Sequence, residues 1–124
     1  MSVTLTFPSD TANVGLARTL AASMSARADL PIDQLEDVRL AVDEAVSQVI
    51  LDAPAGSDIT CTFDVHGTDL AITISAPTSS GTVPAQDTFS WTVLSALVET
   101  VTADVTGNVV TLRLNVRRHV PADA

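Results

Sequence analysis

The sequence predicts a two-layer α/β sandwich (α+β), in which three helices cover one face of a mostly antiparallel sheet. Two observations carry this prediction. Several short segments alternate apolar and polar residues, so each predicted strand has only one apolar face. Three longer segments repeat their apolar residues at helical spacing, and these helices must all pack on that single face. We expect one domain over residues 1–118 and a polar C-terminal tail over residues 119–124.

The chain opens with a predicted strand and a predicted helix. Residues 2–7 alternate strictly up to a proline, which indicates a half-buried strand. Ser9 or Asp10 can cap the helix that follows, and this helix is expected to end near Ala28. Its inner face comprises Val14, Ala17, Leu20, Ala21 and Met24.

A second helix is predicted from Pro31 to about Asp52 and is the longest element of the chain. Its apolar residues are Leu35, Val38, Val42, Ala45 and Val49. A second stripe along the same helix consists of Asp37, Ala41, Glu44 and Gln48. This stripe faces either a ligand or only water.

The second half of the chain alternates strands with one more helix. The predicted elements are a hairpin over 58–65 and 69–76, an exposed loop over 77–87, a helix over 88–102, and a hairpin over 103–106 and 110–116. Trp91 has helical spacing from Leu94 and Val98, which favours a core position over a stacking platform. Cys61 alternates with apolar residues, which favours a core position over a redox role.

Charge and composition exclude several classes of function. The chain has 15 acidic and 6 basic residues, a formal charge of -9, and all its basic residues are Arg. Such a field repels phosphates, so we expect no direct binding to nucleic acid or to anionic membranes. A single cysteine permits no intrachain disulfide. The N-terminus lacks a signal-peptide pattern and no apolar run could span a bilayer, so we expect a cytoplasmic protein.

Few residues are candidates for chemistry. Glu44 could act as a general base at a helix-lined cleft, although spacing alone favours a solvated acid. Arg18 lies at the border of the apolar face of the first helix, where it could bind a partner carboxylate or pair with Asp10 or another nearby acid. His66 and His119 lack the neighbours of a metal site or a catalytic triad, and we expect no metal site.

Three segments resemble bacterial anti-sigma factors of the histidine-kinase-like ATPase (GHKL, Bergerat) fold. They are Asn13–Arg18, Asp37–Gln48 and Phe89–Leu97, and the order of elements agrees over nearly the full chain. The resemblance is greatest to actinobacterial members that control stress or stationary-phase sigma factors. Members of this family are serine kinases that bind an alternative sigma factor and are countered by an anti-anti-sigma factor.

The resemblance assigns nucleotide-site positions to five residues. Glu44 matches the general base, whereas Gln48 stands where the family has an asparagine that helps to hold Mg²⁺ and phosphate. Ala76 replaces the aspartate that reads adenine, and Thr78 and Ser90 stand where glycines let the backbone approach the nucleotide. Because these changes act on the same ligand, we expect weak or no binding of ATP and Mg²⁺.

The resemblance therefore implies an interaction protein. We expect an anti-sigma factor that sequesters an alternative sigma factor and is released by an anti-anti-sigma antagonist, with kinase activity lost. The expected binding surface includes Asn13 and Arg18 on the first helix, and the family commonly forms homodimers. The alternative is an active ATP-dependent serine kinase that phosphorylates the anti-anti-sigma factor.

Overall fold

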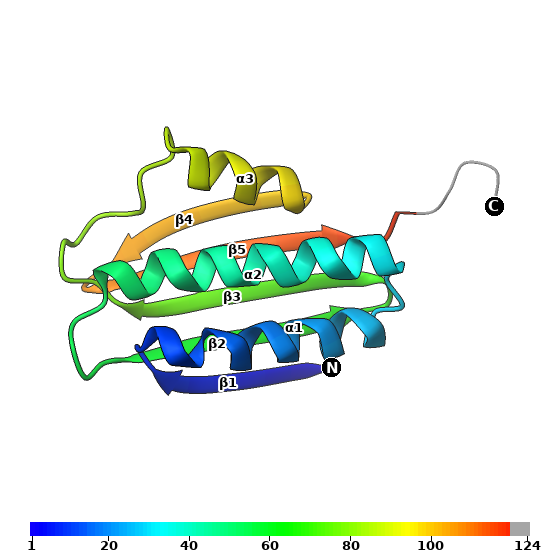
Figure 1. Ribbon diagram of the computed structural model, residues 1–124, viewed down its shortest axis with the longest axis horizontal. Helices are drawn as coiled ribbons and strands as arrows, with labels where there is room; N and C mark the ends of the chain where they lie inside the picture. The colour runs from blue at the N-terminus through cyan, green and yellow to red at the C-terminus, as the bar shows by residue number, and fades with distance from the viewer. Residues whose placement is uncertain (120–124) are drawn as a thin grey trace.

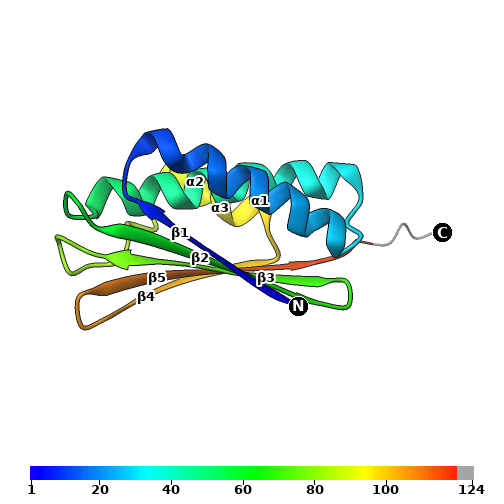
Figure 2. The same cartoon turned by 90° about the horizontal axis from the view of Figure 1, so that it is seen from below.

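Residues 1–119, the part of the chain that this computed structural model describes, form a five-stranded sheet with three α-helices on one face (Figures 1 and 2). The strands are β1 (Ser2–Pro8), β2 (Asp58–His66), β3 (Asp69–Pro77), β4 (Thr100–Thr106) and β5 (Val109–Arg117). The helices are α1 (Val14–Arg27), α2 (Ile32–Asp52) and α3 (Phe89–Leu97), with a short 3-10 helix η1 (Thr11–Asn13) before α1. The predicted two-layer architecture and order of elements are confirmed. Residues 120–124 of the predicted tail lie outside the described residues.

All neighbouring strands are antiparallel, and their order in the sheet is β1-β2-β3-β5-β4. The β2–β3 and β4–β5 hairpins turn at Gly67 and Gly107, whose positive φ angles suit glycine. The connection through α3 carries the chain from β3 to the edge of the sheet, and β5 then returns to lie between β3 and β4. Figure 2 shows the helices on one side only, so the other face of the sheet is not covered by them.

The core lies between the sheet and the helices. Its largest fully buried side chains are Phe63, Met24, Ile59, Leu70, Ile72, Ile74, Leu94, Leu112 and Leu114. Cys61 is fully buried on β2 and Trp91 is only 7% exposed on α3. Both are therefore core residues, as their spacing favoured. Burial of this apolar surface is the main source of folding free energy in such a domain.

Helix α2 runs across the middle of the helical layer, between α1 and α3 (Figure 1). Its buried residues are Gln34, Val38, Ala41, Val42, Ala45, Val46 and Val49. The assignment of Ala41 to the second stripe is wrong, because Ala41 is fully buried; its small side chain fits at the edge of the apolar face. Asp37, Glu44 and Gln48 are half-buried.

Helix α3 is shorter than predicted. The sequence predicts a helix over 88–102, but α3 ends at Leu97, and β4 begins at Thr100. Val98 already has an extended backbone, and the N–H of Glu99 donates to the carbonyl of Asn115 on β5, at 3.0 Å. The spacing of the apolar residues around 101 fits either a helix or a strand. The segment forms a strand because it pairs with β5 and because many of its residues are β-branched, which favours extended backbone.

The C-terminal end of β5 is fastened to the start of α2. The side-chain amide of Gln34 donates to the carbonyl of Arg117 at 2.7 Å, and its oxygen accepts from the N–H of His119 at 2.8 Å. Arg118 also pairs with Asp29 at 3.4 Å.

Among residues 1–119, no helix is both long enough and apolar enough to cross a lipid bilayer.

Candidate functional site

Three side chains from α2 and α3 form a hydrogen-bonded network centred on Ser90. The hydroxyl of Ser90 donates to Oε1 of Glu44, and the side-chain amide of Gln48 donates to the same hydroxyl at 2.8 Å. All three residues are half-buried. Glu44 and Gln48 are one helical turn apart on α2, so both reach the same point on α3.

The first turn of α3 holds Ser90 in this position. Thr88 caps the helix, because its hydroxyl accepts the N–H of Trp91 at 3.1 Å. The buried indole of Trp91 anchors the next residue in the core. Ser90 therefore lies between a capped helix end and a core aromatic residue, and its hydroxyl is directed at α2.

This network uses the groups that a nucleotide site would need. A general base accepts the proton of its substrate, and in this structure Oε1 of the Glu44 carboxylate accepts the Ser90 hydroxyl, which would compete with a substrate hydroxyl for that oxygen. The Gln48 amide nitrogen, a donor that could reach a phosphate, is directed at Ser90. Both residues thus make a hydrogen bond within the protein through Ser90.

Ala76 and Thr78 lie at the end of β3, beside this network. Ala76 is 2% exposed and faces the core, where it offers no hydrogen-bonding side chain. Thr78 is 1% exposed; its hydroxyl donates to Asp52, and its N–H donates to the carbonyl of Asn108 at 2.9 Å. The loop over 77–87 is mostly exposed, as predicted. Thr78 is its one buried residue, and Pro77 and Pro84 are half-buried.

Asp52, the last residue of α2, organises the start of this loop. Besides Thr78, it accepts the Ser80 hydroxyl at 2.7 Å and the Ser80 N–H at 3.1 Å. Hydrogen bonds from Thr78 and then Ser80 hold the pKa of the Asp52 carboxyl below its usual value. Asp52 is not among the site residues that the sequence predicts. A signal was available, since an acid in the last turn of a helix opposes the helix dipole and needs local donors.

Two adjoining pockets open beside the network. One has a volume of about 220 Å³ and the other about 280 Å³, and Gln48, Pro84 and Ala85 line both. The first extends toward Asp52 and the second toward Leu51 and Ser90. Both therefore lie between the C-terminal end of α2 and the loop that leads into α3.

Asn13 and Arg18 lie on the other side of α2. The side-chain amide of Asn13 donates to the carbonyl of Pro8 at 3.0 Å, which fastens η1 to β1. Arg18 is on α1 and pairs with Asp43 of α2 at 3.5 Å, so its nearby acid is not Asp10. Its side chain remains 44% exposed. The structure thus brings Glu44, Gln48 and Ser90 together and places Asn13 and Arg18 apart from them.

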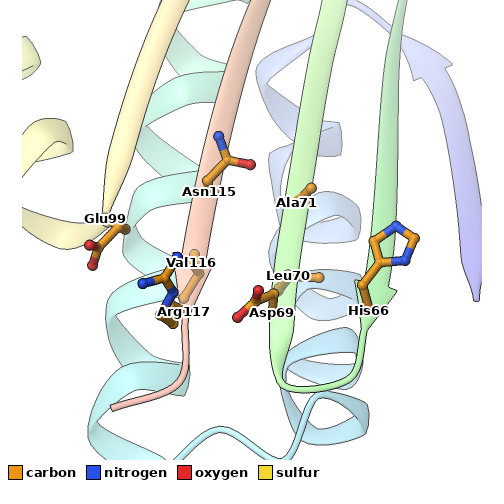
Figure 3. Close-up of a pocket in the computed structure, with 8 residues that line it drawn as sticks. All are labelled: His66, Asp69, Leu70, Ala71, Glu99, Asn115, Val116 and Arg117. Atoms are coloured by element: carbon orange, nitrogen blue, oxygen red, sulfur yellow. The ribbon is translucent and has the colours of Figure 1, made fainter.

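A larger pocket, of about 320 Å³, lies near the β2–β3 turn (Figure 3). It is lined by His66, Asp69, Leu70, Ala71, Glu99, Asn115, Val116 and Arg117. The figure shows that its polar side chains come from the ends of neighbouring strands, at the opposite end of β3 from Thr78. It shares no residue with the Glu44–Ser90–Gln48 network.

Comparison with known proteins assigns the chain to a family and supports the fold. Residues 7–114 match the histidine kinase-like ATPase domain family, and the chain belongs to that family. Anti-sigma-F factor RsbW from two strains of Mycobacterium tuberculosis is 33% identical over 113 residues, which cover 86% of this chain and 67% of RsbW. The resemblance found in the sequence is thereby confirmed.

A solved structure agrees with the fold. The crystal structure of the RsbU and RsbW domains of Rv1364c from Mycobacterium tuberculosis matches with a TM-score of 0.76 at 13% sequence identity. The match covers 98% of this chain, and the chain spans about a third of that longer protein, 34%. At this identity the match bears on the fold alone.

Proposed function

We propose that this chain is an anti-sigma factor that sequesters an alternative sigma factor by direct binding and has lost the kinase step. The observation that supports the loss of the kinase step is the Glu44–Ser90–Gln48 network, in which Oε1 of Glu44 and the amide of Gln48 are bonded to Ser90. The relationship to anti-sigma-F factor RsbW supports the partner class. An anti-anti-sigma antagonist would release the sigma factor by competing for this chain.

Two features of the residues present support the proposed loss of ATP binding. Ser90 is bonded to Glu44, and Ala76 has no acceptor for an adenine amino group. Among the described residues no group of three or more His, Cys, Asp or Glu side chains is arranged to hold a metal ion.

The proposed sigma-binding surface includes α1 and its N-terminal approach. Arg18 is partly exposed, and its pair with Asp43 at 3.5 Å is longer than a direct charge-assisted hydrogen bond. The planar guanidinium of Arg18 can therefore leave this long ion pair with Asp43 and make a bidentate contact with a carboxylate of a partner. Asn13 holds the backbone at the start of α1, so it would support the same surface.

We also propose that the protein forms a homodimer and acts in the cytoplasm.

Co-purification with alternative sigma factors tests this proposal. Arg18→Glu should weaken the complex by about tenfold or more, since a contact of opposite charge becomes one of like charge. Arg113→Glu is the matched control, because it makes the same charge change at an exposed Arg that also pairs with an acid, Asp104, but lies on β5 outside the proposed surface. An Arg18→Glu variant with unchanged affinity removes Arg18 from the surface, and failure to bind any sigma factor overturns the proposal.

The retained Glu44 favours one alternative, an active serine kinase that phosphorylates an anti-anti-sigma factor. Calorimetric titration with Mg-ATP separates the two functions. Absent or millimolar binding is the expected result. Micromolar binding that Gln48→Ala abolishes would favour the kinase and overturn the proposal that kinase activity is lost.

Analytical ultracentrifugation tests the proposed dimer, and a purely monomeric protein would contradict it.

A further inference from the structure

An apolar patch lies where α2 ends and α3 begins. Leu51 is 86% exposed and Phe89 is 84% exposed, the two highest values among the large apolar side chains of residues 1–119. Leu51 lines the same pocket as Thr88 and Ser90, the two neighbours of Phe89 in the chain. We call Leu51, Val83, Pro84, Ala85 and Phe89 the Leu51–Phe89 patch.

The patch is indented as well as apolar. The two pockets of about 220 and 280 Å³ meet along Gln48, Pro84 and Ala85, so together they form one depression beside α2 with a mixed apolar and polar lining. Leu51, Val83, Pro84 and Ala85 of the patch line it, and Phe89 adjoins the lining residues Thr88 and Ser90 in the chain. Single exposed apolar residues are common on protein surfaces, but apolar residues grouped around a depression are typical of binding sites. Two adjoining pockets can receive two neighbouring apolar side chains from one face of a bound helix.

The surroundings of the patch are acidic. Glu44, Asp52 and Asp87 lie within or next to the segments that form it. Between Arg39 and Arg113 the sequence contains no Lys or Arg, so no basic residue of the chain belongs to these segments. Within residues 1–119, the ion pairs use other acids, which leaves these three without a basic partner.

We propose that the Leu51–Phe89 patch docks a cationic amphipathic helix of a protein partner. Apolar side chains of that helix would occupy the depression, and its Lys or Arg residues would face Glu44, Asp52 and Asp87. An anionic membrane is disfavoured because the same acids repel it. A second copy of this chain is disfavoured because pairing two patches would bring like charges together. The proposal does not depend on sigma-factor binding through α1.

A defined probe tests the proposal without knowledge of the natural partner. The probe is a synthetic 14-residue peptide, a size of about four helical turns, made of Leu and Lys with Leu at helical spacing. A peptide of the same composition with scrambled order has the same charge but no apolar face. Calorimetry should detect binding of the first peptide and at least about fivefold weaker binding of the second.

Two protein variants locate the site. Leu51→Gln and Phe89→Ser should each weaken peptide binding by at least about fivefold, because each removes an apolar contact without changing the charge. Ile32→Gln is the matched control and should change binding less than twofold; Ile32 is 67% exposed at the opposite end of α2. Because these are exposed residues, thermal unfolding should remain close to that of the wild-type protein.

Four outcomes would overturn the proposal. They are equal binding of both peptides, an effect of Ile32→Gln as large as that of Leu51→Gln, binding to phosphatidylglycerol vesicles that Leu51→Gln abolishes, and self-association that the same variant abolishes. Failure of the wild-type protein to bind any sigma factor would overturn the proposed function and leave these results unaffected, so the two proposals can fail separately.

Discussion

Cys61 shows how burial changes the chemistry of one side chain. It lies on β2 with no exposed surface, and burial raises the pKa of its thiol to about 12. The chain has no Tyr, and its six basic residues are all Arg. Cys61 is therefore the one side chain of the described residues expected to titrate between about pH 9 and pH 12.

We expect the free energy of unfolding to fall as pH rises from 9 to 11. The unfolded thiol loses its proton near its ordinary pKa while the folded thiol keeps it, so the unfolded state gains stability by up to about 1.4 kcal/mol per pH unit. Urea unfolding at several pH values measures this slope. Cys61→Ala should lower stability at pH 8 and flatten the slope; an equally steep slope in that variant would contradict the prediction.

Ser90 links Glu44 and Gln48 in the hydrogen-bonded network between α2 and α3. Ser90→Ala should leave the Glu44 carboxylate and the Gln48 amide without their common partner, which costs about 1 kcal/mol of unfolding free energy. Ser95→Ala, an exposed change on the same helix, corrects for the higher helix propensity of alanine. If chemical denaturation gives the same effect for both variants, the network makes no net contribution.

At the scale of elements, Asp52 fastens the end of α2 to the loop that follows β3. Asp52→Asn should destabilise the protein by about 1 kcal/mol at pH 7, because charge-assisted hydrogen bonds from Thr78 and Ser80 are weakened. The folded pKa of Asp52 is lowered, so this contribution is present above its unfolded pKa, near 3.9, and is lost as pH falls below it.

The test compares variants at two pH values. The difference between the wild-type protein and Asp52→Asn should shrink between pH 7 and pH 3 when measured by urea unfolding. Asp87→Asn makes the same charge change at an exposed residue outside these hydrogen bonds. A difference for Asp52→Asn that is independent of pH would assign the loss to geometry and not to the carboxylate charge.

The third helix shows the limit of local patterns at this scale. Apolar spacing alone extended α3 to residue 102, whereas pairing with β5 makes residues 100–106 an edge strand. Strand order has the same origin, since β5 inserts between β3 and β4 through contacts between residues far apart in the chain. Periodicity identifies each element, but hydrogen bonds between elements set the boundaries.

For the whole molecule, charge opposes folding. The formal charge of -9 on 124 residues makes the acids repel one another in the compact state, and the structure pairs only some of them with Arg. Raising NaCl from about 10 to 150 mM should raise the melting temperature by a few degrees, because it shortens the screening length to about 8 Å. Differential scanning calorimetry measures the shift, and an equal osmolality of sucrose is the control. A lower melting temperature in salt would mean that ion pairs outweigh repulsion.

The sequence by itself determined the two-layer architecture, the order of elements, the core positions of Cys61 and Trp91, and the family, because these follow from periodicity and motif residues. Through the family resemblance it also assigned Glu44, Gln48 and Ser90 to one site. Only the tertiary structure decided that they bond to one another, that Arg18 pairs with Asp43, and that Asp52 holds a buried threonine. The physical reason is that side-chain partners lie on different elements, and their distances depend on how those elements pack.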